Sequence, residues 1–477
     1  LDNQSSHVPQ VGRSESGPGS NRSGGRSSCG PWSVGDEREY DIVRTLFDEV
    51  VHWKRNIFML PLGSAGREFV MEIANIISFF NLDTPLSGIA WTVLTIACHL
   101  LLQKPLGSSR GGENATILRS RLELWKAGKL EDLLLDARCI QAHLRPRRVT
   151  SARSERGHTD TDFSRHVFSG NINSAIRCLS ESKSPGVLRL DDIADPATGE
   201  TVDDILRQKH PAGADPDPDV LLEGEPEPVR TVLFAAITAD LIKKIARSIK
   251  GSSGPSGVDA DGWRAMLTCY AAASDQLCSV LAEAARRICT DSVGGRDLEA
   301  FTAARLIALD KRPGVRPIAV GEVHRRIIAR AVMRVVESDV MDVVAPSQLC
   351  VGIPSACETC VHAMREGFNN PSTEGILLVD ASNAFNSVNR KAALHNIRRL
   401  CPALATFASN THTDRVRLFV TGSGELHSTE GTCQGDPLAM AIYALAITPL
   451  VRRLAHLHPD TFQLWYADDD AALGRLL

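Results

Sequence analysis

The sequence predicts a mixed α and β fold (α/β, in the α+β sense) that follows a mainly helical N-terminal region. Between residues 37 and 144, apolar residues recur at every third or fourth position, which is the spacing of amphipathic helices. After Val229, short apolar runs bounded by turn residues alternate with helical periodicity, which indicates strands as well as helices. At 477 residues, the chain is long enough for two or three domains that each bury a core.

The chain divides into four predicted parts. Residues 1–36 are rich in Ser, Gly, Arg, Asn and Pro and bury too little apolar surface to offset the entropy of ordering, so we expect a disordered tail. Residues 37–144 are the helical region, and residues 145–230 are polar linkers around a short helical module. Residues 231–477 form the α/β part. The chain begins without methionine and stops soon after its last acidic run, which indicates a fragment.

Composition narrows the classes of function. The 53 basic and 57 acidic residues give a formal net charge of −4, so only a local basic surface can attract a polyanion. The 12 cysteines are scattered, and the close pair Cys357 and Cys360 lacks a second pair that would complete a zinc site. Reduced thiols indicate an intracellular protein, in the nucleus or the cytoplasm.

One apolar segment, Leu86–Gln103, has no formally charged residue. At about eighteen residues it is just long enough to span a bilayer, but it contains His99 and lacks a basic flank on its N-terminal side. We therefore expect a buried helix of a helical bundle and no membrane contact.

The first residues that suggest chemistry are Lys311 and Arg316. The Pro-Gly pair between them is a turn signal, and Val315–Val320 has the pattern of a short strand, so the two cations flank a hairpin turn. Arg makes a forked contact with phosphate and Lys acts as a point charge, so this pair can straddle a triphosphate. An exposed basic turn is the alternative.

The Gly-rich residues 251–257 lack the Lys-Ser/Thr of a P-loop, which favours a plain loop there.

The helix predicted over Glu322–Val336 carries a stripe of arginines. Arg326, Arg330 and Arg334 lie four residues apart, opposite an apolar core side. Such a stripe is either a solvated surface or a contact for template phosphates, and the sequence does not separate the two.

Two further segments place polar groups at the ends of apolar elements. Ile376–Val379 is a continuous apolar run, which predicts a strand buried on both faces, and this strand ends at Asp380. A carboxylate at that point is either catalytic or a helix cap.

Gln434 and Gly435 precede a long apolar helix. The Asp-Pro step that follows them accounts for the start of that helix, but it does not account for Gln434 and Gly435 themselves. The amide and the glycine would allow close approach to a base pair.

Near the end of the chain, the alternating apolar run Phe462–Tyr466 stops at three carboxylates, Asp468, Asp469 and Asp470. Apolar residues resume directly afterwards, so we predict a β-hairpin with acids at its tip. Like charges this close repel one another, and a divalent cation such as Mg²⁺ would resolve the repulsion. A solvated acidic turn is the alternative.

In this order, the four segments resemble the motifs of reverse transcriptases, particularly those of non-LTR retroelements, whereas residues 1–230 carry no such motif. The resembling segments are Lys311 with Arg316-Pro317-Ile318, Asp380-Ala381-Ser382-Asn383-Ala384-Phe385-Asn386, Gln434-Gly435-Asp436-Pro437-Leu438 and Tyr466-Ala467-Asp468-Asp469, preceded by the looser Gly254-Pro255-Ser256-Gly257-Val258-Asp259. The family implies a right-hand polymerase, with fingers and a palm that contains an antiparallel sheet. The thumb of that family has no sequence here.

The resemblance implies a catalytic site that uses metal ions. Asp380 and Asp468 would hold two Mg²⁺ ions, with Mn²⁺ as an alternative. Asp469 would complete the acidic cluster, and the Ala381 carbonyl would be a further ligand. Such metals lower the pKa of a primer 3′-hydroxyl and hold the attacking and leaving oxygens of an in-line displacement. Whether the third carboxylate of the run changes metal use is left open.

The resemblance also implies substrate contacts. Lys311 and Arg316 would bind the triphosphate of a dNTP, and Phe385 would exclude the ribose 2′-hydroxyl. Gln434 and Gly435 would lie against the nascent base pair. Tyr466 would support the hairpin near the primer end.

The implied partners are an RNA template, a DNA primer and dNTPs, and the oligomeric state is left open. One alternative is an RNA-dependent RNA polymerase with a similar palm, which Phe385 and the turn Ala467-Asp468-Asp469 disfavour. The other is a catalytically inactive retroelement remnant that only binds nucleic acid. The intact carboxylates oppose that second alternative, and the missing thumb favours it.

Overall fold

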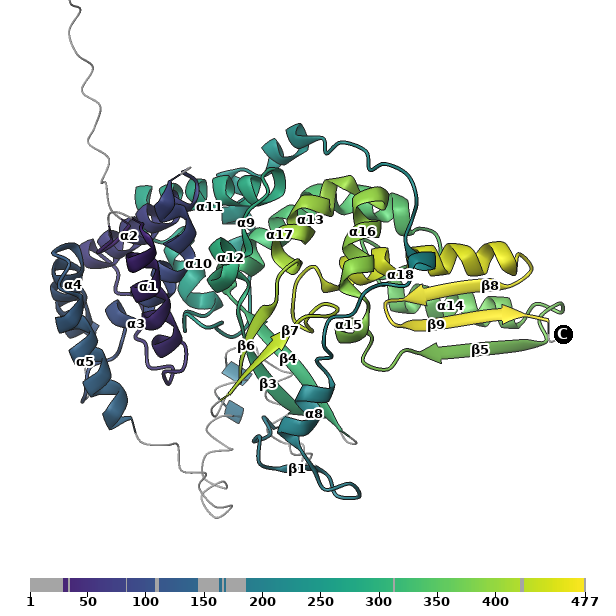
Figure 1. The fold of residues 1–477 in the computed structure, drawn as a ribbon, viewed down its shortest axis with the longest axis horizontal. Helices are drawn as coiled ribbons and strands as arrows, with labels where there is room; N and C mark the ends of the chain where they lie inside the picture. Colours follow the sequence, from purple (N-terminus) through teal and green to yellow (C-terminus); the bar gives the residue numbers. More distant parts are fainter. Residues whose placement is uncertain are drawn as a thin grey trace, which may run out of the picture.

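The structure is a computed structural model, and it describes residues 29–32, 35–82, 84–107, 111–144, 163–164, 167–168, 186–311, 314–420 and 424–475. Most of the predicted disordered tail and most of the predicted short helical module lie outside these residues. Figure 1 shows the N-terminal helices at one end of the molecule, a four-stranded sheet near its middle and a three-stranded sheet at the other end.

The N-terminal part is helical, as predicted. Its elements are α1 (Glu37–Val50), α2 (Ser64–Phe80), the 3₁₀ turn η1 (Pro85–Ile89), α3 (Ala90–Leu101), α4 (Gly111–Lys126) and α5 (Leu130–His143). All residues of α3 except Thr92 are buried, so the charge-free segment is a core helix. Cys29 and Trp32, which lie in the range expected to be a tail, are also buried, and the Trp32 ring meets the Trp125 ring edge-on at 5.9 Å.

A second group of helices continues the same core. These helices are α9 (Ala239–Ser248), α10 (Ala260–Thr268), α11 (Ala272–Thr290), α12 (Gly295–Thr302), α13 (Val323–Val344), α16 (Arg390–Leu400), α17 (Pro402–His412) and α18 (Ala439–Leu457), with a 3₁₀ turn η3 (Thr231–Ala236) before α9. One apolar cluster joins α1, α2 and α3 to α11, α13 and α17. The N-terminal helices therefore pack directly onto the α/β part.

By length and composition, α18 is apolar enough to cross a bilayer, and α2 and α3 pass the same test as one segment that is bent by 120°. In the folded chain α18 packs against α13 and α16, while α2 packs against α3, α4 and α11. Core helices pass the same test, so these packing contacts are a sufficient reason for their apolar composition.

The four-stranded sheet has the order β4–β3–β6–β7. Its strands are β3 (Ala304–Asp310), β4 (Val315–Gly321), β6 (Val416–Val420) and β7 (Glu425–Ser428). β3 and β4 pair antiparallel with Asp310 opposite Val315, which confirms the predicted hairpin. A hairpin of β1 (Ile193–Asp195) and β2 (Glu200–Thr201) leads into α8 (Val202–Gln208), and Val202 and Leu206 of α8 pack on this sheet. The last part of the predicted linker region is thus folded.

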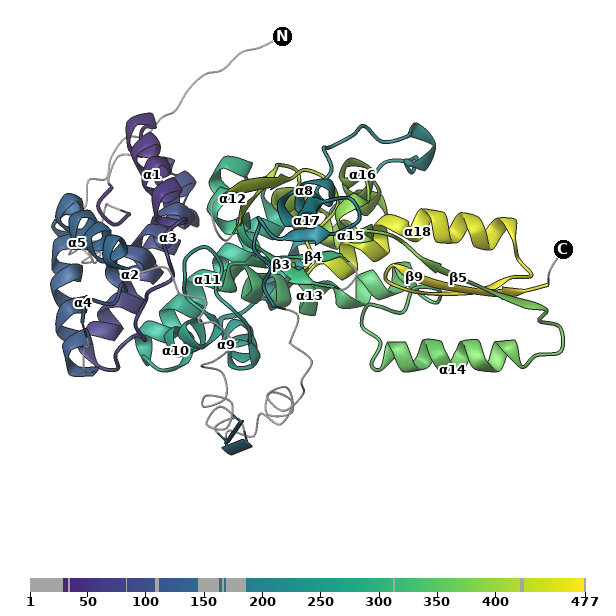
Figure 2. The ribbon, with the colours of Figure 1, turned by 90° about the horizontal axis from the view of Figure 1, so that it is seen from below.

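The three-stranded sheet has the order β5–β9–β8, and its strands are β5 (Gly375–Asp380), β8 (Phe462–Tyr466) and β9 (Asp469–Gly474). β8 and β9 form the predicted acidic hairpin. In Figure 2, α14 (Ala356–Phe368) and α18 run along opposite sides of this sheet.

The prediction that Ile376–Val379 is buried on both faces is wrong for the described residues. These four side chains are between 40% and 71% exposed. β5 is an edge strand, because β9 is its one partner among the described residues. A continuous apolar run signals burial only where neighbouring elements cover both faces, and here α14 packs against β8 and β9, so the edge strand β5 lies outside the covered part of the sheet.

A buried carboxylate fixes the Gly-rich loop at residues 251–257. The Glu322 side chain, at the junction of β4 and α13, accepts hydrogen bonds from the Ser256 backbone N–H and, at 2.7 Å, from Ser256 Oγ. A Cβ on Gly254 would lie within 2.9 Å of the Glu322 backbone and side chain, so glycine is required there. The loop is therefore a packing element, in agreement with the plain-loop interpretation.

This carboxylate should make stability depend on pH. Burial raises the pKa of Glu322 to about 7 from its usual 4.5, so the folded state retains a proton that the unfolded state releases. The contribution of Glu322 is fully present below pH 4.5 and is lost as the pH rises through 7. We expect the denaturation midpoint of Glu322→Gln to fall less between these pH values than that of the unmodified chain. The exposed Glu358→Gln on α14 is the control, and an equal slope in all three proteins would contradict the prediction.

Candidate active site

A cavity of about 510 Å³ lies where the two sheets approach each other, and it collects most of the residues that the sequence singles out. Its lining includes the predicted residues Lys311, Arg316, Asp380, Ala381, Phe385, Gln434, Gly435 and Asp468. Asp469 and Tyr466 do not line it, and they sit beside it in the β8–β9 hairpin. The cavity thus brings together groups from the β3–β4 turn, β4, β5, the loop before α18 and the acidic hairpin.

Backbone pairing sets the positions of the carboxylates. Asp380, the last residue of β5, is directly opposite Asp469 in β9, and the Ala381 N–H donates to the Asp468 carbonyl at 3.2 Å. Asp380 therefore reaches the cavity from the end of β5, and Asp468 reaches it from the adjoining turn between β8 and β9. Partial burial and the charges of Asp468 and Asp380 raise the pKa of the Asp469 carboxyl. The part of this shift that comes from Asp468 and Asp380 is the mutual repulsion that the sequence predicts for the acidic group.

The third carboxylate of the run faces away from this group. Successive side chains of a strand alternate between its faces, and Asp470 lies opposite Val379 and Trp465 rather than opposite Asp380. The Asp470 side chain is buried, and its Oδ1 has no hydrogen-bond partner among the described residues. Burial raises the pKa of Asp470 to about 6. Asp470 is therefore separate from the pair that lines the cavity.

A buried glutamine, which sequence reasoning missed, holds the acidic turn. Ala467 adopts a positive φ of 58°, a backbone conformation that costs a residue with a side chain about 1–3 kcal/mol. Gln348 is 2% exposed; its Oε1 accepts from the Ala467 N–H at 2.9 Å, and its Nε2 donates to the Ala467 carbonyl at 3.2 Å. The two residues that flank Gln348 hydrogen-bond to the Trp465 backbone. No local sequence signal links residue 348 to a turn so far along the chain.

Gln348→Ala should destabilise the fold by about 1–3 kcal/mol, because two buried backbone groups of Ala467 lose their partners. It should also reduce any activity that depends on Asp468, because the turn that carries Asp468 is no longer held. Gln463→Ala is a matched control: Gln463 lies in the same hairpin, donates to the Val451 carbonyl of α18 at 3.1 Å and accepts from the Trp465 ring N–H at 3.0 Å, and neither hydrogen bond involves the turn. Urea unfolding and an activity assay, performed on both variants, test the prediction. Equal activity loss in the two variants would contradict it.

The basic side of the cavity is the β3–β4 hairpin. The Lys311 N–H donates to the Gly314 carbonyl at 3.0 Å, which closes the turn, and Arg316 lies opposite Leu309 in the next strand. Neither cation has an ion-pair partner among the residues that the structure describes. Both charges are therefore available to an anion.

The Gln434–Gly435 segment is fixed against β4. The Gln434 carbonyl accepts from the Ala319 N–H at 2.8 Å, and Gly435 has a φ of +112°. A Cβ on Gly435 would lie 2.4 Å from the Ala319 carbonyl oxygen, so the close approach that requires glycine is to this strand. Gln434 Oε1 is buried without a partner among the described residues.

The Phe385 ring, which also lines the cavity, packs against Tyr443 of α18 with ring centroids 5.0 Å apart.

Asp436, next in the chain, belongs to a buried ion pair. Its Oδ1 accepts from the Leu438 N–H at 2.9 Å in the turn before α18, but the helix begins at Ala439 with Leu438 as its N-cap residue, so the prediction that the Asp-Pro step starts the helix is wrong. The same carboxylate pairs with Arg325, and His412 Nε2 lies 3.6 Å from it. Burial by itself would raise the pKa of Asp436, but Arg325 and His412 hold it well below its usual range. The ion pair ties the Gln434–Gly435 segment to α13.

The arginine stripe of α13 divides into two parts. Arg326 donates to the carbonyls of Lys250, at 3.1 Å, and Ser252, so it anchors the loop after α9. Arg330 and Arg334 make no such backbone contact among the described residues, and they line a groove of about 430 Å³ next to the cavity together with Arg326, Gly435 and Pro437. A solvated surface and a contact for template phosphates are both compatible with this placement.

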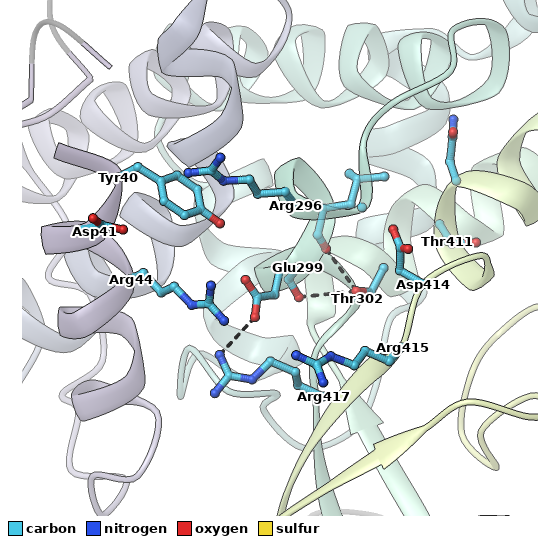
Figure 3. Close-up of a pocket in the computed structure, with 13 residues that line it drawn as sticks. Tyr40, Asp41, Arg44, Arg296, Glu299, Thr302, Thr411, Asp414, Arg415 and Arg417 are labelled. Atoms are coloured by element: carbon cyan, nitrogen blue, oxygen red, sulfur yellow. Dashed lines mark hydrogen bonds and ion pairs between the residues drawn. The ribbon is translucent and has the colours of Figure 1, made fainter. Parts of the chain in front are cut away.

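A second cavity, of about 460 Å³, joins the N-terminal helices to the rest of the molecule (Figure 3). It lies between α1, α12 and the start of β6, and three of its charged lining residues, Arg296, Glu299 and Arg417, form ion pairs. Arg417 contacts three carboxylates, on Asp48, Glu299 and Glu425, at 2.7, 3.1 and 2.6 Å. Arg296 lies over the Tyr40 ring, 3.3 Å from its centroid. These contacts hold the two parts of the molecule together, away from the acidic hairpin.

The donor set fits a magnesium ion that is completed by substrate. Among the described residues, no group of three or more His, Cys, Asp and Glu side chains converges as a ready-made metal site. Asp380 and Asp468 nevertheless present two carboxylates to one open cavity. Mg²⁺ characteristically binds one or two carboxylates and fills its remaining positions with water and substrate phosphates.

Comparisons with known proteins do not identify a family for this chain, so the function is inferred from the geometry of the site. No family model matches the chain, and no curated protein matches it. Among solved structures, the chain is similar to an apo telomerase from Candida tropicalis that is truncated from its C-terminal domain. The sequence identity is 11%, the TM-score is 0.28, and the match covers 90% of this chain and 88% of that chain. A likeness at this level carries no argument about function.

Proposed function

We propose that the chain is an RNA-directed DNA polymerase of a retroelement, which transfers a nucleotide from a dNTP to a primer 3′-hydroxyl. The observation that carries the proposal is the single cavity that combines Asp380 and Asp468 on one side with Lys311 and Arg316 on the other. Nucleotidyl transfer needs this combination: carboxylates that hold divalent cations, and cations that bind a triphosphate.

Each side of the cavity has a role in this proposal. Asp380 and Asp468 hold the metal ions, and Asp469 adds negative charge beside them. Mg²⁺, when bound, would lower the pKa of the primer hydroxyl and offset the charge on the leaving phosphates. Lys311 and Arg316 orient the triphosphate so that its α-phosphorus faces the primer.

The choice of nucleotide depends on an aromatic residue in the lining of the cavity. The Phe385 ring is held against Tyr443, so it presents a fixed apolar surface at the cavity. A ribose 2′-hydroxyl against such a surface would lose its hydrogen bonds to water, which favours a dNTP. Gln434 supports the base pair from the other side, with a buried Oε1 that has no protein partner among the described residues.

Primer extension tests the proposal. A DNA primer annealed to an RNA template is incubated with Mg²⁺ and either dNTPs or NTPs, and Asp468→Asn is run in parallel. We expect extension with dNTPs that disappears in the variant and in EDTA. Extension with NTPs instead would indicate an RNA polymerase. Tight primer–template binding that is equal with and without EDTA, with no extension under any condition, would indicate a nucleic-acid-binding remnant.

A further inference from the structure

The cavity contains a third cation, which comes from the part of the chain predicted to be linkers. Lys209 directly follows α8 and lines the same cavity as Lys311, Arg316, Asp380 and Asp468. Sequence reasoning assigns no role to it, because residues 145–230 carry no recognisable motif.

The backbone at Lys209 is fixed from two directions. α8 begins with a capping box in which Thr201 and Asp204 exchange hydrogen bonds, and its Val202 and Leu206 side chains are fully buried against the four-stranded sheet. On the cavity side, Asn383 Nδ2 donates to the Lys209 carbonyl at 3.0 Å. Asn383 belongs to the loop that follows Asp380, so Lys209 is tied to the loop that leaves the catalytic strand.

The charge of the Lys209 side chain is not neutralised by any ion pair that the structure describes. It has no ion-pair partner among the described residues, although Lys209 is only partly exposed. Burial and the neighbouring charge of Lys311 lower its pKa. Two lysines close enough to repel each other, in a partly desolvated cavity, are unfavourable without an anion. A polyphosphate between them would relieve both the repulsion and the desolvation.

We propose that Lys209 is a substrate-binding residue that contacts the triphosphate of the incoming nucleotide, together with Lys311 and Arg316. This inference rests on the proposed function, and it makes the β1–β2–α8 segment part of the nucleotide site. The same cation should bind pyrophosphate, the product that carries the released phosphates. A contact with the phosphates of a nucleic-acid strand is the outcome that the test must separate from this one.

The test compares Lys209→Ala, Lys209→Arg and the control Lys129→Ala, whose lysine is exposed in the N-terminal part. Primer extension as a function of dNTP concentration should show a KM that rises about tenfold in Lys209→Ala with a smaller change in kcat, because one charge-assisted contact is lost. Inhibition by pyrophosphate should weaken to a similar extent. Lys209→Arg should restore most of the affinity, since it retains the charge, and Lys129→Ala should match the unmodified chain.

Three measurements can overturn the inference. An unchanged KM for dNTP in Lys209→Ala refutes it directly. Weaker primer–template binding with an unchanged KM would show that Lys209 contacts a strand instead. If the unmodified chain extends no primer, the proposed function has failed, and calorimetric titration of Mg²⁺–pyrophosphate into the unmodified chain and Lys209→Ala still decides whether Lys209 binds phosphate. Equal affinities there would refute the inference as well.

Discussion

Replacing Asp468 with asparagine is expected to lower the rate of primer extension by about a thousandfold or more, and Asp380→Asn should do the same. Both carboxylates line the cavity, and each supplies negative charge that a divalent cation needs. A bound metal contributes several kcal/mol of charge stabilisation in the transition state, and about 4 kcal/mol corresponds to a thousandfold in rate. Asparagine keeps the shape of aspartate, so the fold should be unaffected.

Asp470→Asn is the matched control for this experiment. It changes the same residue type in the same acidic run, but Asp470 faces away from Asp380 and is buried with an unpartnered Oδ1. Extension should therefore stay within about twofold of the unmodified chain. Because burial raises the pKa of Asp470 to about 6, removing its charge should also increase stability above that pH.

Single-turnover extension with saturating dNTP gives the rates, and primer–template binding is measured separately. Loss of extension with unchanged binding in Asp468→Asn is the expected pattern. If Asp470→Asn loses as much activity as Asp468→Asn, the division of the acidic run into a cavity-facing pair and a buried third member is wrong.

The parts of the site that the sequence predicted are those with short-range signals. The turn between Lys311 and Arg316 depends on a Pro-Gly pair, and the tip of the acidic hairpin depends on an alternating run that ends in carboxylates. Each signal lies within a few residues of the group it positions. The order of the four motif segments then predicted that they form one site, and most of the predicted site residues line one cavity in the structure.

The parts that sequence reasoning missed depend on contacts between distant segments. Gln348 holds the turn at Ala467, and Lys209, which belongs to the polar segment 145–230, lines the cavity. Neither residue lies in a sequence pattern that would indicate its role. The error at Ile376–Val379 has the same origin, because burial depends on neighbours that the strand itself does not specify. Local pattern predicts elements, whereas their neighbours are fixed only by the fold.

Arg325→Ala is expected to destabilise the protein by about 3–5 kcal/mol, because it leaves a buried carboxylate without its cation. The side chains of Arg325 and Asp436 are 6% and 3% exposed, and Arg325 also donates to the Thr302 carbonyl at 2.9 Å. Since the pair holds the pKa of Asp436 low, its contribution is present above the usual pKa of 3.8 and is lost as the pH falls through the folded value. Urea unfolding at neutral pH measures the loss.

A matched control separates burial from charge in this experiment. Lys391 and Asp215 also form an ion pair, at 2.6 Å, but both side chains are exposed, so Lys391→Ala should leave the urea midpoint unchanged. A similar loss in Lys391→Ala and Arg325→Ala would mean that charge pairing as such, rather than an unpaired buried carboxylate, determines the effect.

The double variant Arg325→Met with Asp436→Leu should recover most of the lost stability, because an apolar pair avoids the desolvation of two charges. This variant also shows what the ion pair does for the site. The pair ties the Gln434–Gly435 segment to α13, and the Ala319 N–H holds the same segment through the Gln434 carbonyl. If the ion pair serves only as an anchor, primer extension should return together with stability. Extension that stays low in a stable double variant would show that the charge of Asp436 or Arg325 itself acts on the substrate, since an anchor alone is replaceable by packing.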